Sequence, residues 1–124
     1  MPDQSCPARI VLTTAANPEE ARMLGRAFVE EQLAACATLI PGVESIYRWK
    51  GAIESSGETM LLLKTDVDRL AALESRLREL HSYEVPEFLV LPIEAGSRAY
   101  LDWMLESLGR VAKKPTAKTS APEG

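Results

Sequence analysis

The hydrophobic residues of this chain change their spacing several times, and each change predicts a new element. The run ARIVLTTA (8–15) places apolar and β-branched residues in succession, which is typical of a strand buried on both faces. Over residues 18–35 the apolar positions recur near the helical period. Asn17, Pro18 and Glu20 fit a helix start, as the capping residue, the first-turn proline and the capping-box acid. A strand followed by an amphipathic helix is therefore expected.

Strand character returns over residues 36–54, where β-branched and aromatic side chains dominate. Pro41 and Gly42 interrupt this stretch, and we expect a bend or bulge there because proline cannot donate a hydrogen bond to the ladder. The small polar residues at 55–57 predict a tight turn. ETMLLLKT (58–65) then returns as the partner strand of a hairpin.

The leucines of the next segment recur at offsets of three, four and three, which predicts a second helix: Leu70, Leu73, Leu77 and Leu80. It begins after Thr65 or Asp66 and stops before Pro86, because the residue preceding a proline is pushed out of helical space. Residues 85–95 predict a fourth strand, and a last short helix starts near Ser97. The order βαββαβ plus a C-terminal helix is the ferredoxin-like split β-α-β arrangement, an α+β fold with an antiparallel sheet.

The predicted hairpin is long for a domain of this size. Its strands extend over about 10 residues or more at about 3.3 Å each, and the projecting part exposes edges that carry Ile46, Tyr47 and Trp49. The sheet face without helices also needs cover. We therefore expect a symmetric oligomer in which copies of the chain pair these edges.

Composition narrows the class of protein. The 124 residues suit one domain, expected at 8–108, with a disordered lead-in at 1–7 and a disordered basic tail at 109–124. No apolar run approaches the roughly 18 to 20 residues that cross a bilayer, and the start lacks a secretory signal, so a cytoplasmic protein without a membrane partner is expected. The net charge of −4 and the basic tail leave an acidic body, which argues against nucleic acid.

Motifs for catalysis are missing from the sequence. No glycine-rich phosphate loop occurs, and a single histidine without a companion motif does not make a nucleophile and base pair, so we expect no enzyme. The soft or borderline metal ligands are His81 and Cys36, without an HxxxH or CxxC motif. Both have plain alternatives, since a histidine suits a helix C-terminus and a free cysteine suits a core.

Several dispersed stretches carry a family resemblance. LAACATLIPGVESIYRWKGAIE (33–54), LLLKT (61–65) and LHSYEVPEFLVLPIEAGSRAYLDW (80–103) occur in an order that resembles the CutA family of divalent-cation tolerance proteins over residues 9–108. The resemblance implies a PII-like homotrimer and an association with copper or other divalent cations. Some members carry a cysteine and a second histidine at the positions of Thr13 and Leu80, which weakens a copper site within one chain. Three chains can still pool ligands.

The resemblance turns these residues into two candidate sets. The first holds the metal, weakly bound copper or alternatively zinc or another divalent cation: His81, Cys36 and Glu84. The second lines a cleft between subunits: Tyr47, Trp49, Glu58, Lys64, Tyr83 and Glu87. The cleft residues have an alternative as intersubunit core and rim ion pairs. The expected function is divalent-cation tolerance by metal binding. The alternatives are a PII-like small-molecule sensor or signalling module, and a structural trimer with an indirect metal effect. The sequence does not identify a protein partner.

Overall fold

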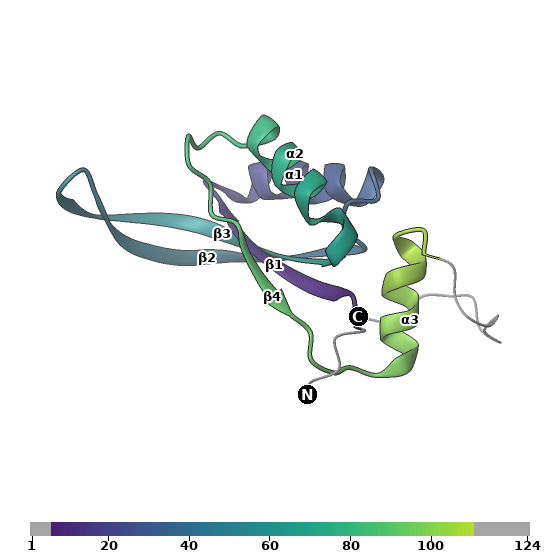
Figure 1. Cartoon of the computed structure of the whole chain (residues 1–124). Helices are drawn as coiled ribbons and strands as arrows, with labels where there is room; N and C mark the ends of the chain where they lie inside the picture. Colours follow the sequence, from purple (N-terminus) through teal and green to yellow (C-terminus); the bar gives the residue numbers. More distant parts are fainter. Residues whose placement is uncertain (1–5, 111–124) are drawn as a thin grey trace.

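Four strands form one antiparallel sheet in the order β2-β3-β1-β4 in the computed structural model, which describes residues 6–110. The strands are β1 (Ala8–Ala15), β2 (Cys36–Trp49), β3 (Ala52–Asp66) and β4 (Leu89–Pro92). The helices are α1 (Pro18–Glu30), α2 (Leu70–Leu80), which follows a short 3-10 turn, and α3 (Arg98–Ser107). Helices α1 and α2 cover one face of the sheet, and α3 lies beyond one end of it (Figure 1). The expected ferredoxin-like α+β fold is confirmed.

The main core lies between the sheet and the first two helices. Because side chains alternate across a strand, one face of the central strands β1 and β3 supplies apolar residues while the helices supply the stripe that meets them. The fully buried members are Val11, Ala15, Ala21, Leu24, Phe28, Leu61, Leu63, Leu73 and Leu77. Each large apolar side chain buried in this way contributes about 1.5 to 3 kcal/mol.

Helix α3 is fastened to the end of the sheet by a second core and by charge. Met104 and Leu108 pack with Ala8 at the start of β1. Below them the buried carboxylate of Asp66 accepts hydrogen bonds from Arg69 Nη1 at 2.7 Å and from Arg110 Nε at 2.8 Å. The ion pairs therefore tie the segment after α3 to the end of β3.

The hairpin turn lies at Lys50 and Gly51, so the turn predicted at 55–57 is wrong. Both turn residues have positive φ, 51° and 83°, which is the backbone of a two-residue hairpin turn that matches the twist of the strands. Residues 55–57 lie within β3 instead, where Ser56 pairs with Ser45 of β2. The turn forms at this position because Gly51 adopts a positive φ without strain.

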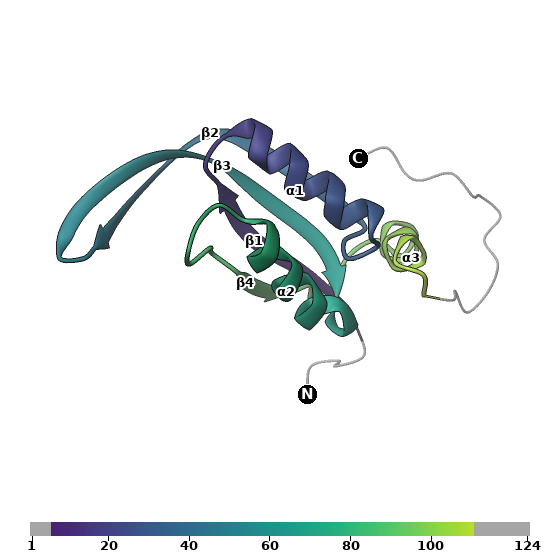
Figure 2. The ribbon, with the colours of Figure 1, turned by 90° about the horizontal axis from the view of Figure 1, so that it is seen from above.

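The bulge predicted at Pro41 and Gly42 is confirmed. The register between β2 and β3 shifts between Ile40 and Val43, and Gly42 has a φ of 77°. Beyond the shift, residues 43–58 pair only within the hairpin, because β1 ends its pairing at Thr59. We call residues 43–58 the arm. Figure 2 shows it reaching away from the body of the molecule.

Two other elements are shorter than predicted. Helix α1 ends at Glu30 rather than near 35, because Gln32 takes a left-handed φ of 59° and turns the chain toward β2. Strand β4 covers only 89–92 of the predicted 85–95. The preceding residues leave the sheet and form a loop, 81–88, between α2 and β4.

Contacts of the fold extend beyond both ends of the expected 8–108 domain. The carbonyl of Pro7 accepts a hydrogen bond from the N–H of Val67 at 2.8 Å, and Arg110 pairs with Asp66. The remainder of the predicted lead-in and tail, 1–5 and 111–124, lies outside the described residues. None of the helices in residues 6–110 is long and apolar enough to cross a membrane.

Candidate functional site

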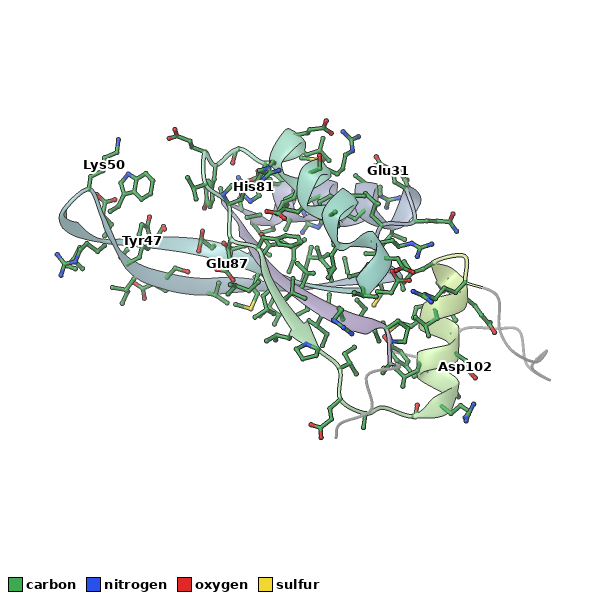
Figure 3. The ribbon with its side chains drawn as sticks, in the orientation of Figure 1. Glu31, Tyr47, Lys50, His81, Glu87 and Asp102 are labelled. Atoms are coloured by element: carbon green, nitrogen blue, oxygen red, sulfur yellow. The ribbon has the colours of Figure 1, made fainter. Side chains whose placement is uncertain are left out.

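A cavity of about 580 Å³ lies between the arm and the loop 81–88. We call it the cleft. Its walls come from the end of β1, from both strands of the arm and from the loop: Thr14, Ser45, Ile46, Tyr47, Trp49, Glu54, Glu58, Tyr83, Glu84, Val85 and Glu87. Figure 3 shows Tyr47 on the arm and Glu87 near the base of the arm. The cleft is therefore formed where three separate segments of the chain meet.

Glu58 is the most buried acid of the cleft, with 9% of its surface exposed. Its Oε1 accepts a hydrogen bond from Ser45 Oγ at 2.6 Å. Its Oε2 accepts from Tyr83 Oη at 2.7 Å and from Thr14 Oγ1 at 3.2 Å. Hydrogen bonds to an ionised group are stronger than neutral ones, so the three hydroxyls hold this carboxylate at a set position.

The cleft is acidic throughout. Four of its lining residues are glutamates and none is lysine, arginine or histidine. Within residues 6–110, Glu58 has no ion-pair partner. Burial, followed by the nearby charge of Glu58, raises the pKa of Glu87. Burial and the hydrogen bond to Glu58 likewise raise the pKa of Tyr83 well above its ordinary value. The site therefore favours positive charge.

His81 caps the C-terminal end of α2 and lies buried beside the cleft. Its Nε2 is 2.7 Å from the carbonyl oxygen of Thr14, and its Nδ1 accepts the N–H of Tyr83 at 3.0 Å. This pair of contacts fits a neutral ring that carries its proton on Nε2, because a carbonyl accepts and an N–H donates. The ring therefore connects the end of β1 to the loop that carries Tyr83.

Glu20 secures the same loop from the side of α1. Its carboxylate accepts the N–H of Ser82 at 2.9 Å and the hydroxyl of Ser82 at 3.0 Å. Its Oε2 also lies 3.7 Å from Nδ1 of His81. Burial acts to raise the pKa of Glu20, but these hydrogen bonds outweigh it and leave the pKa lowered. The loop is thus held by backbone and side-chain contacts at its first two residues.

The three predicted metal ligands lie at different places. His81 uses both ring nitrogens on backbone groups, whereas Glu84 lines the cleft. Cys36 begins β2, and its Sγ is 3.7 Å from Oη of Tyr100 on α3. Burial and this thiol raise the pKa of Tyr100 to about 12. Within residues 6–110, no cluster of three His, Cys, Asp or Glu side chains is placed to hold a metal ion.

The residues predicted for the cleft are largely brought together. Five of the six line it: Tyr47, Trp49, Glu58, Tyr83 and Glu87. Lys64 lies elsewhere on β3, where its Nζ donates to Thr38 Oγ1 at 2.7 Å. Sequence reasoning missed Thr14, Ser45 and Glu54. The alternation that joined Tyr47 to Trp49 could have found Ser45, whereas Thr14 enters only through the pairing of β1 with β3.

Comparisons with known proteins agree with one another. The family described as CutA1 divalent ion tolerance protein matches residues 9–107. A divalent-cation tolerance protein CutA from Thermus thermophilus is 46% identical, over 81% of this chain and 97% of that relative. Another from Pectobacterium atrosepticum is 41% identical, over 83% and 94%. The crystal structure of CutA from Xylella fastidiosa is 35% identical with a TM-score of 0.80, over 82% of this chain and 98% of that one.

Proposed function

Because the chain belongs to the CutA1 divalent ion tolerance protein family, we propose that it is a homotrimer that binds divalent cations weakly in clefts shared between subunits. Its relatives carry names that refer to cation tolerance and not to an enzymatic reaction. The hydroxyls of Ser45, Thr14 and Tyr83 donate to Glu58, and we propose that they position this carboxylate for binding, without a catalytic step.

The observation that carries the proposal is the acidic cleft. Four glutamates line it without a basic side chain, and Glu58 is buried among hydroxyls without a cationic partner in residues 6–110. Carboxylate oxygens ligate divalent ions, and a site of given ligands binds the first-row ions in an order that peaks at copper. An oxygen site of this kind is expected to bind several divalent cations, with copper the tightest.

The candidate ligands differ from the set predicted by sequence. Glu58, Glu84 and Glu87 line one cavity, and a neighbouring subunit would supply the remaining ligands. His81 would have to give up its hydrogen bond from Tyr83 before Nδ1 could bind a metal ion. A site at His81, Cys36 and Glu84 stays a prediction, which the same titration tests.

Assembly with other copies is supported by the apolar residues that the single chain leaves exposed, and the number of three copies comes from the family resemblance. Ile46 and Ile53 on the arm are 70% and 63% exposed, and the outer strand β4 exposes Leu89 and Leu91. Unpaired strand edges and exposed apolar faces are ordinarily covered by another chain. If each arm paired with the next copy of the chain, the pairing would cover the exposed residues of the arm and of β4. It would also close the open side of the cleft.

Calorimetric titration of the tag-free chain with Cu(II) and Zn(II) tests the proposal. We expect saturable binding, tighter for copper, with a Kd between about 1 μM and 1 mM. Glu58→Gln should weaken it at least fivefold, whereas Glu74→Gln, the same change on the outer side of α2, should not. Mass should be checked on each sample, with about 41 kDa expected, three times the 13.6 kDa of one chain.

Other results would decide differently. Saturable binding lost in His81→Ala and Cys36→Ala but kept in Glu58→Gln would place the ion on the ligands predicted from the sequence. If neither metal binds with a Kd below about 1 mM, the metal proposal is excluded, whatever the mass of the oligomer.

A further inference from the structure

We propose that the cleft also binds a small organic cation, a molecule with a primary ammonium group on an aromatic or apolar body. This ligand class rests on the proposed function, because it shares the cleft and Glu58 with the metal ion. Two features carry the inference: the hydrogen bonding of the buried carboxylate of Glu58, and a wall of aromatic rings, which a bare metal ion does not use.

The first feature is the hydrogen bonding of Glu58. A carboxylate offers about four acceptor positions, two on each oxygen. Oε2 is filled by Tyr83 and Thr14, but Oε1 accepts only from Ser45 within residues 6–110. A buried charge without a partner is costly, since it has lost water and gained no opposite charge. An ammonium group supplies both the missing donor and the opposite charge.

The second feature is the aromatic wall. Tyr47, Trp49 and Tyr83 line the cleft, and the first two remain 41% and 42% exposed in the single chain. Aromatic faces attract cations, and the indole attracts them most strongly. The chain already uses this property, because Nζ of Lys50 lies 5.8 Å from the centroid of the Trp49 ring. An exposed aromatic wall beside a carboxylate fits an organic cation.

The size and charge of the cleft favour an organic cation over the other ligand classes. A volume of about 580 Å³ falls within the range of about 300 to 1,000 Å³ typical of small-molecule sites, far above what one ion fills. An anionic ligand would meet four glutamates and no basic side chain. A neutral ligand would leave the charge of Glu58 unpaired. The apolar side chains of Ile46 and Val85 then provide contact for the body of the ligand.

The inference is tested with phenethylammonium chloride as the probe, by calorimetry and by ligand-observed NMR on the full chain. The matched neutral probe is 2-phenylethanol, which has the same ring and chain length, with potassium chloride added to equal ionic strength. We expect saturable binding of the ammonium probe at least tenfold tighter than that of the alcohol. Zinc should compete with the ammonium probe for the same cleft.

Variants connect the binding to the two features. Glu58→Gln and Trp49→Leu should each weaken the ammonium probe at least fivefold, and Trp49→Phe should weaken it less than Trp49→Leu because a ring is retained. Glu74→Gln, which alters an exposed carboxylate on α2, should leave it unchanged. If Glu58→Gln does not fold, the Trp49 pair still decides, because that ring makes none of the hydrogen bonds to Glu58.

Three results would overturn the inference. They are equal binding of the alcohol, binding that survives both Glu58→Gln and Trp49→Leu, and absence of saturation up to about 10 mM, where a binding free energy falls below about 3 kcal/mol. Metal binding without ammonium binding would leave the proposed function intact and remove this ligand class. Ammonium binding without metal binding would do the reverse.

Discussion

Two buried carboxylates show that side chains of the same kind can have different roles, one in stability and one in ligand binding. Asp66 is held by Arg69 and Arg110, so its charge is compensated within the chain. Glu58 accepts hydrogen bonds from three hydroxyls and has no cationic partner within residues 6–110. The first arrangement fastens α3 to the sheet, whereas the second keeps a negative charge at the wall of the cleft. A charge left without a partner is the one available to a ligand.

The charge of Asp66 predicts a dependence of stability on pH. Burial acts to raise its pKa, but the hydrogen bonds from Arg110 and Arg69 outweigh burial and leave the pKa lowered. Between the lowered folded pKa and the unfolded value of about 3.9, the unfolded chain binds more protons, so stability rises with pH. The contribution is therefore complete above about pH 5 and is lost as pH falls through the folded pKa.

Asp66→Asn keeps an oxygen that can cap the turn at Arg69 but removes the charge. We expect it to lower the free energy of unfolding by about 2 kcal/mol at pH 7, from lost hydrogen bonds to a charged group. The difference from the wild type should shrink toward pH 2 to 3. Urea unfolding at fixed protein concentration measures it, with Glu106→Gln on the exposed side of α3 as control. A difference that stays constant with pH would contradict the assignment.

At the scale of elements, the hairpin turn shows how backbone geometry sets register. The positive φ angles of Lys50 and Gly51 place the tip, and the tip in turn pairs Ser45 with Ser56 and Val43 with Glu58. A turn placed at 55–57 would have shifted every pair of the arm. Glu58 would then not face the hydroxyl of Ser45. The turn therefore also positions the residues of the cleft.

Substitutions at the two turn positions should act in opposite directions. Lys50→Asn should raise the free energy of unfolding by about 0.5 kcal/mol, because asparagine tolerates positive φ better than lysine. Gly51→Val should lower it by about 1 to 3 kcal/mol, since a β-branched residue is strained there. Chemical denaturation measures both variants. Two neutral substitutions would show that the tip does not contribute to stability.

At the scale of the whole molecule, the arm is an element that the single chain leaves largely uncovered. It pairs with itself, exposes apolar residues and carries half of the cleft away from the body. Copies that pair through their arms would convert this exposed surface into an interface. The neighbouring copy would then add its own residues to the lining of each cleft. Assembly and ligand binding are therefore expected to depend on the same residues.

A charge on the arm should weaken assembly. We expect Ile46→Glu with Ile53→Glu to raise the dissociation constant of the oligomer at least tenfold, because charges would be buried without partners at the interface. Met23→Glu, which changes an exposed apolar residue on α1, should leave the mass unchanged. Light scattering over a dilution series measures both. An arm variant that keeps the wild-type mass at every dilution would show that the arm is not the interface.

The sequence by itself determined the class of fold and pointed to five of the residues that line the cleft. Periodic spacing and capping residues specified the elements because these signals act within a few residues of chain, as at Asn17 and Ser97. Alternation along one strand was enough to place Tyr47 with Trp49. The same local reasoning failed at residues 55–57, where a polar triplet resembles a turn but lies within a strand.

Only the tertiary structure decided which polar groups meet. The hydroxyls around Glu58 come from Thr14, Ser45 and Tyr83, on three segments whose approach depends on strand register and on the loop held by His81. Within one chain, tertiary structure also places Cys36 beside Tyr100 and His81 beside Tyr83, whereas residue chemistry alone had grouped the two as ligands. Hydrogen bonds and ligand sets depend on distances of a few ångströms between remote residues, and spacing along the chain carries no such distances.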